Sequence, residues 1–258
     1  MLLGKGRELY RVMPWREDTR PYYVLVSELM LQQTQVDRVI PKFSAFIACF
    51  PDEKTLAEAS LGEVLTLWSG LGYNRRAKFL REAARKITYE LEGIFPDTKQ
   101  GLMNLPGVGP GTAGAILAYA FNQPAVFIET NVRTVYFHHF FTHGEKVADK
   151  ELIEIVSKTI DAAHPREFYW AMMDYGSWLK KNGVRRTAQS QHYKKQSALK
   201  GSVREVRGQI IRLLTSGDVT IEHIRKELKA DQRFEAALAG LTHDGLVSQT
   251  GSSLHLTK

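Results

Sequence analysis

The stretch SELMLQQTQ, residues 27–35, places one carboxylic acid and three side-chain amides within about two helical turns. Glu28 stands among apolar residues, and Gln32, Gln33 and Gln35 follow it. Apolar surroundings disfavour an ionised carboxylate, so they raise the pKa of the carboxyl group and keep a proton available near neutral pH. The pattern therefore predicts a general acid on a helix, with amides displayed close to it.

The segment LPGVGPG, residues 105–111, brings glycines together between two helical patterns. Glycine permits positive φ and close approach to the backbone, and amides at a helix N-terminus bind phosphate well. Such a hairpin can hold a nucleic-acid backbone without reading its sequence. The alternative is an ordinary turn between helices, for which one glycine would be enough. The predicted contacts are Gly107, Val108, Gly109, Gly111 and Thr112.

The composition fits a soluble globular protein with a polyanionic partner. The 258 residues carry a formal net charge of +7, which favours nucleic acid or an anionic membrane surface, although a merely basic enzyme is the alternative. We expect no signal peptide and no membrane span. The single cysteine, Cys49, cannot form an intramolecular disulfide or supply a four-cysteine metal cluster.

Helical periodicity dominates the first 181 residues. Helices are predicted within 24–40, 51–71, 74–93, 101–121, 150–164 and 167–181. Pro41 is expected to end or kink the first helical segment, and Ser60 is a plausible N-cap. In 74–93, we expect Ala77, Leu80, Ala84 and Ile87 to face inward and the basic residues to face outward. A short β-branched and aromatic run at 124–128 is the strand signal of this region.

The C-terminal segment has a different pattern. After a basic linker at 186–202, apolar spacing predicts helices around 206–214, 221–228 and 234–241. Residues 246–258 read as two short strands around a Gly-Ser turn. Three helices and a hairpin form a winged helix, of which some bind DNA and others bind protein.

Several motifs, in order from about residue 10 to about residue 180, resemble a known enzyme family. They are MPWR (13–16), PYYVLVSELMLQQTQVDRVIPKF (21–43), WSGLGYNRRAKFL (68–80), LPGVGPGTAGAILAYAF (105–121), ETNVRTV (129–135) and AMMDYGSW (171–178). They resemble the HhH-GPD superfamily of DNA glycosylases, and within it the MutY-type adenine glycosylases. The resemblance implies a two-lobed helical fold with a DNA-binding cleft, and hydrolysis of a bond between a base and its sugar.

In that family two carboxyl groups carry the reaction. The resemblance makes Glu28 the acid that protonates the departing base. Glu129 stands where the family has an aspartate that lies against the sugar and stabilises positive charge. The alternative for Glu129 is a cap for the helix that follows it. We expect the two carboxyl groups to converge on one base–sugar linkage.

The resemblance also implies roles in base extrusion and in the base pocket. Gln33 would fill the gap left by the extruded base, and Tyr73 would wedge on the other side. Arg16 and Trp170 are predicted to line the base pocket, with Trp170 replacing a polar family residue. Gly111 stands where bifunctional relatives carry a nucleophilic lysine, so no strand-nicking lyase activity is expected.

Two further departures from the family affect the expected ligands. Many relatives hold a four-cysteine iron–sulfur cluster after the MMDYG helix, where this chain has no cysteine. We expect no cofactor there, and leave open a monovalent cation at the hairpin backbone. Lys180, Lys181, Arg185 and Arg186 would contact phosphates or form a solvated face. The histidines in HHFFTHGEK (138–146) are not predicted to bind metal.

The resulting hypothesis is a mainly α protein. It consists of a glycosylase core (1–185), with one lobe at 21–123 and the other at 1–20 plus 124–185, followed by the linker and the winged-helix-like domain (203–258). We expect a cytoplasmic, nucleoid-associated monomer that excises adenine from A:G or A:8-oxoguanine mismatches in duplex DNA. The alternatives are excision of uracil, mismatched thymine or a deaminated purine, and an inactive DNA-binding repair module.

Overall fold

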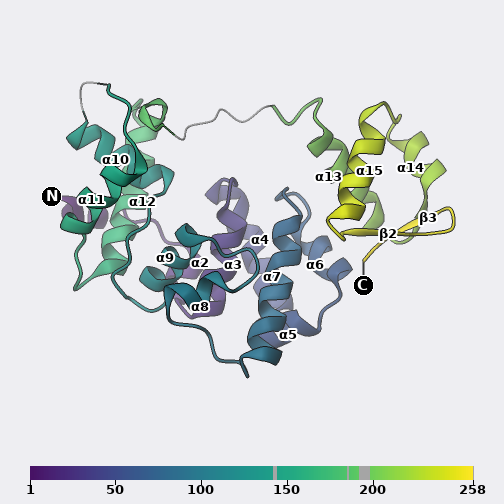
Figure 1. The fold of residues 1–258 in the computed structure, drawn as a ribbon, viewed down its shortest axis with the longest axis horizontal. Coiled ribbons are helices and arrows are strands. Elements are labelled where there is room, and N and C mark those ends of the chain that lie inside the picture. Colours follow the sequence, from purple (N-terminus) through teal and green to yellow (C-terminus); the bar gives the residue numbers. More distant parts are fainter. Residues whose placement is uncertain (142–143, 185, 192–197, 258) are drawn as a thin grey trace. The chain divides into compact units, whose positions relative to one another are not determined.

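The computed structural model describes residues 1–141, 144–184, 186–191 and 198–257 (Figure 1). The predicted, mainly helical architecture is confirmed, with one small sheet near the C-terminus. The first helices are α1 (Leu2–Glu8), α2 (Pro14–Glu17), α3 (Pro21–Leu31), α4 (Val36–Cys49), α5 (Glu53–Glu58), α6 (Leu61–Trp68) and α7 (Arg75–Arg85), which continues as a π-helix (Lys86–Glu90). The next are α8 (Lys99–Met103), α9 (Pro110–Tyr119), α10 (Thr130–Phe140), α11 (Asp149–Thr159) and α12 (Pro165–Lys181), with a 3₁₀ turn at Thr187–Gln189. No helix in the described part of the chain combines the length and apolarity that crossing a bilayer requires.

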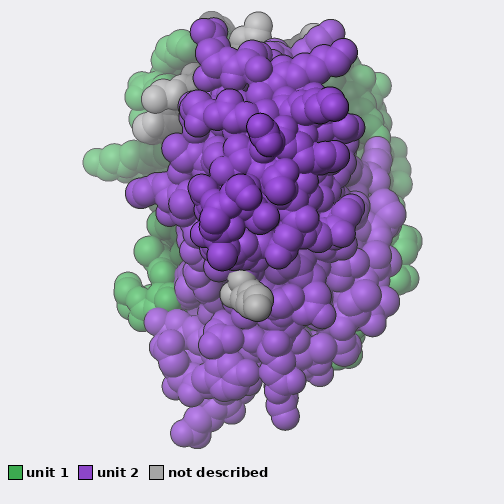
Figure 2. Space-filling model, turned by 90° about the vertical axis from the view of Figure 1, so that its right-hand side faces the viewer, with its two compact units in different colours: residues 1–24, 96–104, 108–196 green, residues 25–95, 105–107, 197–258 purple. Residues whose placement is uncertain are grey.

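The chain divides into two compact units (Figure 2). Unit 1 comprises residues 1–24, 96–104 and 108–196. Unit 2 comprises residues 25–95, 105–107 and 197–258, so the C-terminal winged-helix segment belongs to the same unit as α4 to α7. The chain crosses between the units after residues 24, 95, 104, 107 and 196, and the first of these crossings lies inside α3.

Unit 2 is built on helices whose ends follow the sequence signals. Ser60 is the N-cap of α6, as predicted, and its hydroxyl and the Glu63 carboxylate form a reciprocal capping box. Pro41 lies inside α4 and does not end it. Val39, Phe43 and Phe46 of α4 are buried, and their packing maintains the helix on both sides of the proline.

Unit 1 packs α12 closely against α1 and α10, because glycines stand at the crossing points. A Cβ atom on Gly6 of α1 would lie 2.4 Å from the Cβ of Ala171 on α12. A Cβ on Gly176 of α12 would lie 2.6 Å from the main-chain oxygen of Asn131 on α10. Such distances are possible only without a side chain, so both glycines set the helix spacing.

The expectation of strand character at 124–128 is wrong, because the segment is irregular. Its backbone forms hydrogen bonds with a side chain instead of with a neighbouring strand. The Phe127 amide donates to the Tyr169 hydroxyl at 3.2 Å, and that hydroxyl donates to the Ala125 carbonyl at 2.8 Å. The Phe127 and Tyr169 rings stack at 3.9 Å, so the apolar residues serve packing on α12.

The C-terminal segment has the predicted helices and hairpin. They are α13 (Val203–Leu214), α14 (Ile221–Glu227), α15 (Arg233–His243), β2 (Val247–Thr250) and β3 (Ser253–Leu256). A two-residue strand β1 (Val219–Thr220) adds a third, so the antiparallel order is β1-β3-β2. Val206, Ile210, Phe234, Leu241 and Leu254 form the core of this segment. Of the linker predicted at 186–202, residues 192–197 lie outside the described residues.

Candidate active site

Glu28 lies in the last turn of α3, the helix at whose C-terminal end the glutamine-rich stretch begins. Its neighbours Leu25, Val26, Leu29 and Met30 are fully buried, whereas Glu28 itself is only half-buried. Glu28 therefore lies at the edge of the apolar core. This environment suits a carboxylic acid that must hold a proton for transfer.

Arg76 on α7 connects the end of α3 to the turn that follows α6. Its guanidinium donates to the carbonyls of Leu29, Met30 and Gln32 at 2.6, 2.9 and 2.6 Å. It also donates to the carbonyls of Leu71 and Gly72 at 3.2 and 2.9 Å. The side chain is buried, with 7% of its surface exposed, so these carbonyls take the place of solvent.

The guanidinium charge of Arg76 is solvated by carbonyl dipoles. No ion pair to it is found among the residues that the structure describes. Its planar group lies over the ring of Trp68 at 5.3 Å, a contact that further stabilises the cation. Burial lowers the pKa of Arg76 to about 10, so the side chain is still protonated at neutral pH.

The two turns bridged by Arg76 carry the predicted wedge residues. Gln33 and Tyr73 are both exposed, and both adopt left-handed backbone conformations, with φ of 56° and 48°. Non-glycine residues reach this region at a cost, so the surrounding contacts must stabilise it. Arg76 contributes through the Gln32 carbonyl before Gln33, and through the Gly72 carbonyl before Tyr73. One buried cation thus holds the main chain of the two turns that carry Gln33 and Tyr73.

The glycine hairpin has one crowded glycine and two open ones. At Gly107, φ is 78°, and a Cβ would lie 2.8 Å from the Cβ of Phe79, so only glycine fits. Gly109 is the N-cap of α9, and added Cβ atoms at Gly109 and Gly111 would meet nothing within 4 Å. Val108 is buried and Thr112 half-buried. The start of α9 therefore presents an uncovered backbone, as phosphate binding requires.

Glu129 stands at the N-cap position of α10 in unit 1, but its side chain makes no capping hydrogen bond. Glu129 therefore occupies the N-cap position without a hydrogen-bonded cap, and the choice between a catalytic and a capping role stays open. Burial raises the pKa of this carboxyl group, and the nearby charges of Arg133 and Lys180 act against that rise. The convergence of Glu129 with Glu28, which lies in unit 2, stays a prediction.

Lys180 is one of four basic residues predicted as phosphate contacts or solvated surface. It is half-buried; burial lowers its pKa, Arg11 lowers it further, and Glu129 opposes both effects. Arg186 donates to the Phe141 carbonyl at 2.9 Å, near the C-terminal end of α10. Lys181 is exposed, and Arg185 lies outside the described residues. Lys180 and Arg186 are therefore engaged within unit 1.

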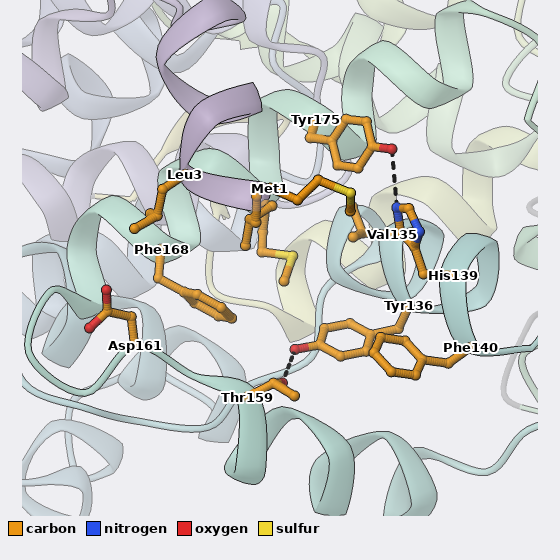
Figure 3. A pocket seen from close by; sticks show the side chains of 12 residues that line it. Met1, Leu3, Val135, Tyr136, His139, Phe140, Thr159, Asp161, Phe168 and Tyr175 are labelled. Carbon is orange, nitrogen blue, oxygen red and sulfur yellow. Dashed lines mark hydrogen bonds between the residues drawn. The ribbon is translucent and has the colours of Figure 1, made fainter.

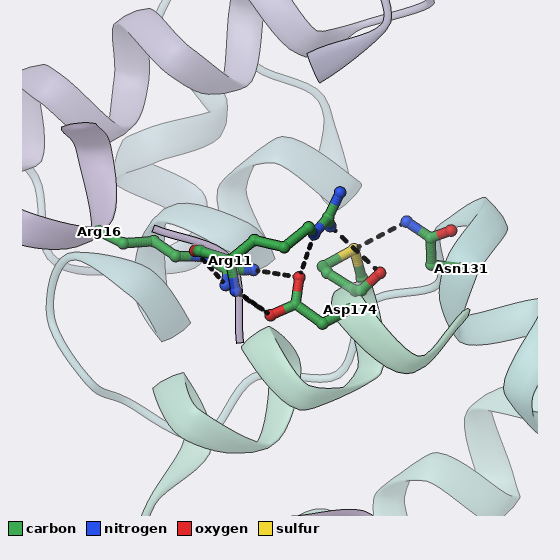
Figure 4. A network of polar contacts seen from close by, with 5 residues as sticks. Arg11, Arg16, Asn131 and Asp174 are labelled. Atoms are coloured by element: carbon green, nitrogen blue, oxygen red, sulfur yellow. Dashed lines mark hydrogen bonds and ion pairs between the residues drawn. The ribbon is translucent and has the colours of Figure 1, made fainter. Parts of the chain in front are cut away.

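Arg16 is held in a buried network around Asp174 of α12 (Figure 4). Its guanidinium donates to both carboxylate oxygens of Asp174, at 2.6 and 3.2 Å, and Asp174 is only 2% exposed. Arg11 donates to the same carboxylate at 2.6 Å. The Arg16 guanidinium also contacts the rings of Tyr10 and Trp170, at 5.2 and 5.3 Å from their centroids. Arg16 and Trp170 therefore lie together, as a base pocket would require, and their role there stays a prediction.

An apolar pocket of about 470 Å³ in unit 1 contains none of these predicted residues (Figure 3). Two pairs of its polar groups are hydrogen-bonded within the pocket wall: Tyr136 with Thr159 at 2.5 Å, and His139 with Tyr175 at 3.1 Å. Burial lowers the pKa of His139. In the histidine-rich segment, His143 lies outside the described residues. The lining is Met1, Leu2, Leu3, Val135, Tyr136, His139, Phe140, Thr159, Asp161, Phe168, Met172 and Tyr175.

Sequence reasoning missed Arg76 and Asp174. The basic residues of 74–93 were expected to face outward, and this is wrong for Arg76. A signal existed, because Arg76 lies on the same helical stripe as the buried Leu80, Ala83 and Ile87. Asp174 is the acidic residue of an otherwise apolar and aromatic motif, which indicates a buried partner of opposite charge.

Comparison with known proteins gives consistent matches. The family model described as HhH-GPD superfamily base excision DNA repair protein matches residues 26–159. An adenine DNA glycosylase of Buchnera aphidicola subsp. Baizongia pistaciae is 36% identical over 170 residues, covering 66% of this chain and 48% of that protein. The chain therefore spans about half the length of that curated relative.

In two further matches, the aligned region covers a larger share of the matched protein. An adenine DNA glycosylase of Mycobacterium tuberculosis (strain CDC 1551 / Oshkosh) is 29% identical over 272 residues, covering 96% of this chain and 90% of that protein. Among solved structures, that of a thermostable thymine-DNA glycosylase superposes with a TM-score of 0.60 at 23% identity, covering 71% of this chain and 89% of that one. This last likeness establishes a shared fold.

Proposed function

Because the chain belongs to the HhH-GPD superfamily of base excision DNA repair proteins, as its motifs predicted, we propose that it is a monofunctional DNA glycosylase. It binds duplex DNA that contains a mismatched base, extrudes that base and hydrolyses the N-glycosidic bond. The proposed base is adenine opposite guanine or 8-oxoguanine, since the two curated relatives above are named adenine DNA glycosylases. The product is an abasic site.

The structural observation that carries this proposal is the Arg76 assembly. Removing a base from a duplex requires extrusion, which leaves an unstacked gap. Gln33 and Tyr73 offer an amide and an aromatic ring from two adjoining turns, and both turns accept hydrogen bonds from one buried guanidinium. Exposed planar groups suit insertion into a base stack, and the order of the turns that carry them before binding reduces the entropic cost.

Two carboxyl groups supply the chemistry in this proposal. Glu28 donates a proton to a ring nitrogen of the departing base, and the apolar packing around it favours the protonated acid. Glu129 acts in its ionised form and stabilises the positive charge that develops on the sugar. Arg133 and Lys180 favour that ionised form against the opposing effect of burial.

Two features of the sequence exclude other chemistry from the proposed reaction. Gly111 offers no amine, so the enzyme forms no Schiff base and does not nick the strand. The iron–sulfur cluster of many relatives needs four cysteine ligands, and Cys49 is the single cysteine of this chain. The residues present do not fit such a cluster, and no step of the proposed reaction uses one.

A panel of duplexes tests the proposal. Single-turnover base release is measured for A:G, A:8-oxoguanine, U:G, T:G and hypoxanthine:T pairs, with and without alkali to reveal abasic sites. We expect adenine release, with strand breaks only after alkali. Glu28→Gln should be about 100-fold slower or worse, as for the loss of a general acid. Glu58→Gln, an exposed glutamate of α5, is the matched control and should release adenine at the unaltered rate.

Each outcome of the panel has a distinct meaning. Unchanged release by Glu28→Gln would refute the acid assignment. Release of another base but not of adenine would favour the alternative specificity, which Trp170 in place of a polar base-pocket residue supports. An unaltered chain that binds mismatched duplex tightly and releases nothing would identify a DNA-binding repair module.

A further inference from the structure

The C-terminal winged-helix segment is docked on α7 of unit 2 through the end of α15. Lys78 of α7 donates to the main-chain oxygen of Asp244 at 2.9 Å. The Asp244 carboxylate pairs with Arg75 of α7 at 3.5 Å and also with Arg207 of α13. Leu256 of β3 approaches α6, since a Cβ on Gly62 would lie 3.7 Å from the Leu256 Cβ. These contacts hold the segment beside the turn that carries Tyr73.

The exposed face of α15 does not have the character of a helix that reads DNA. Its exposed positions include Glu235, Ala236, Ala239 and Thr242. Arg233, at the start of the helix, is paired with Asp231 at 2.7 Å and with Glu205 at 3.5 Å. Binding to a phosphate backbone depends on unneutralised lysine and arginine. The character of α15 therefore points to a use of the domain other than reading DNA with this helix.

That use is indicated by Arg204, in the first turn of α13. Its guanidinium donates a hydrogen bond to the Tyr73 hydroxyl and lies 5.6 Å from the centroid of the Tyr73 ring. Arg76 lies 5.6 Å from the same ring, so the tyrosine contacts one buried and one outer arginine. Arg76 holds the backbone of Tyr73, and Arg204 holds the hydroxyl at the far end of the ring. Tyr73 is 39% exposed, so without Arg204 this end would be free to reorient.

We propose that Arg204 is a positioning residue for the Tyr73 wedge, and that the winged-helix domain contributes to base extrusion by supplying it. This inference rests on the proposed function and assigns the domain a role within it. A hydrogen bond from a charged donor keeps the tyrosine in one orientation before DNA arrives. Such preorganisation reduces the ordering cost on insertion, and here is worth about tenfold in the equilibrium for insertion.

The experiment measures insertion of the wedge separately from base release. The full chain is titrated into a duplex that carries a tetrahydrofuran abasic analogue opposite guanine, with 2-aminopurine as the adjacent base. Loss of stacking raises the 2-aminopurine fluorescence, and no bond is cleaved. The variants are Arg204→Ala, Arg204→Lys, Tyr73→Phe and the double variant Arg204→Ala with Tyr73→Phe. Arg212→Ala, an exposed arginine on the same helix, controls for the loss of one positive charge.

We expect Arg204→Ala and Tyr73→Phe each to reduce insertion about tenfold, and the double variant to be no worse than either. Arg204→Lys should recover part of the loss, and Arg212→Ala should stay within about twofold of the unaltered chain. Matching melting temperatures would establish that the variants are folded. Equal or greater insertion by Arg204→Ala, or additive losses in the double variant, would overturn the inference.

The outcome is distinguishable from failure of the proposed function. If the unaltered chain releases no base from any mismatch, yet Arg204 and Tyr73 are coupled in the insertion assay, the glycosylase proposal fails and the positioning role stands. If base is released normally and Arg204→Ala inserts its wedge normally, the positioning role fails and the glycosylase proposal stands.

Discussion

Replacing Arg76 with methionine tests whether one buried guanidinium holds both turns that present the wedge residues. Methionine has similar length and fills much of the same space, so the change removes donors without opening a large cavity. The main-chain acceptors that lose a donor are the carbonyls of Leu29, Met30, Gln32, Leu71, Gly72 and Tyr73.

The expected loss of stability follows from how many of these carbonyls water can reach. Leu29, Met30 and Leu71 are at most 4% exposed, so their carbonyls are the hardest to rehydrate. An orphaned buried polar group costs about 1–3 kcal/mol. Three such groups, taken at the lower end of that range, give about 3 kcal/mol. For a chain of this size, that corresponds to a fall in melting temperature of roughly 6–12 °C.

Arg76→Lys should lie between the methionine variant and the unaltered chain. An ammonium group places its three donors at one point, so it can serve the carbonyls of α3 or those of the second turn, but not both sets. We expect about half the loss of stability. Amide hydrogen exchange in one turn, 32–35 or 70–73, should become faster while the other turn stays protected.

Thermal melting and amide exchange test whether Arg76 holds both turns. They are measured for Arg76→Met, Arg76→Lys and the control Arg85→Met. Arg85 lies on the same helix, is exposed, and donates to a single carbonyl, that of Ala57, at 3.3 Å. Its replacement should lower the melting temperature by roughly 2 °C or less. A shift for Arg76→Met no larger than that of Arg85→Met would refute the reasoning, as would unchanged exchange in both turns.

Four further predictions concern the substitution of single residues near the proposed site. Burial raises the pKa of Glu129 above its ordinary value of 4.5, so stability is lost progressively as the pH rises from 4.5 to the raised pKa, and the loss is complete above it. Glu129→Gln should therefore raise the melting temperature at neutral pH, with the difference vanishing below pH 4.5, while base release falls. Lys180→Met removes a charge that lowers the pKa of Glu129, so the acid limb of the single-turnover rate should move to higher pH. A Cβ at Gly111 meets open space, so Gly111→Lys should fold and form a Schiff base that borohydride traps on abasic DNA. Gly107→Ala, with φ of 78° and a contact of 2.8 Å to Phe79, should lose about 1–3 kcal/mol in melting experiments and weaken duplex binding.

Structural features that depend on residues close together in the sequence could be predicted from it. The Ser60 cap needs only the glutamate three residues later. The buried stripe that contains Ala77 and Leu80 needs only a helical period. The hairpin of β2 and β3 needs only alternation around a Gly-Ser turn. In each case, the local signal and the tertiary structure favour the same conformation.

Features that depend on distant partners could not be predicted in this way. The strand signal at 124–128 fails because the Tyr169 hydroxyl, some 40 residues away, takes its backbone hydrogen bonds. Arg16 and Asp174 are 158 positions apart, and nothing local shows which acid an arginine will meet. The guanidinium of Arg76 is solvated by main-chain carbonyls. Every residue has such a carbonyl, so the residue types in the sequence give no signal of which residues are its partners.

The motif AMMDYGSW contains residues that take no direct part in the proposed reaction. Their contacts on α12 show what they contribute. Gly176 lets α10 approach so closely that the main chain of Asn131 occupies the place of a side chain. One turn further along α12 is Lys180, and two residues before Asn131 is Glu129, whose pKa responds to the charge of Lys180. The distance between the helices therefore sets the strength of that electrostatic effect, because interaction between charges falls with separation. Asp174 anchors the N-terminal arginines to the same helix. A single helix thus couples the packing of unit 1 to the ionisation of its candidate catalytic carboxylate, and small residues at its contacts are part of that chemistry.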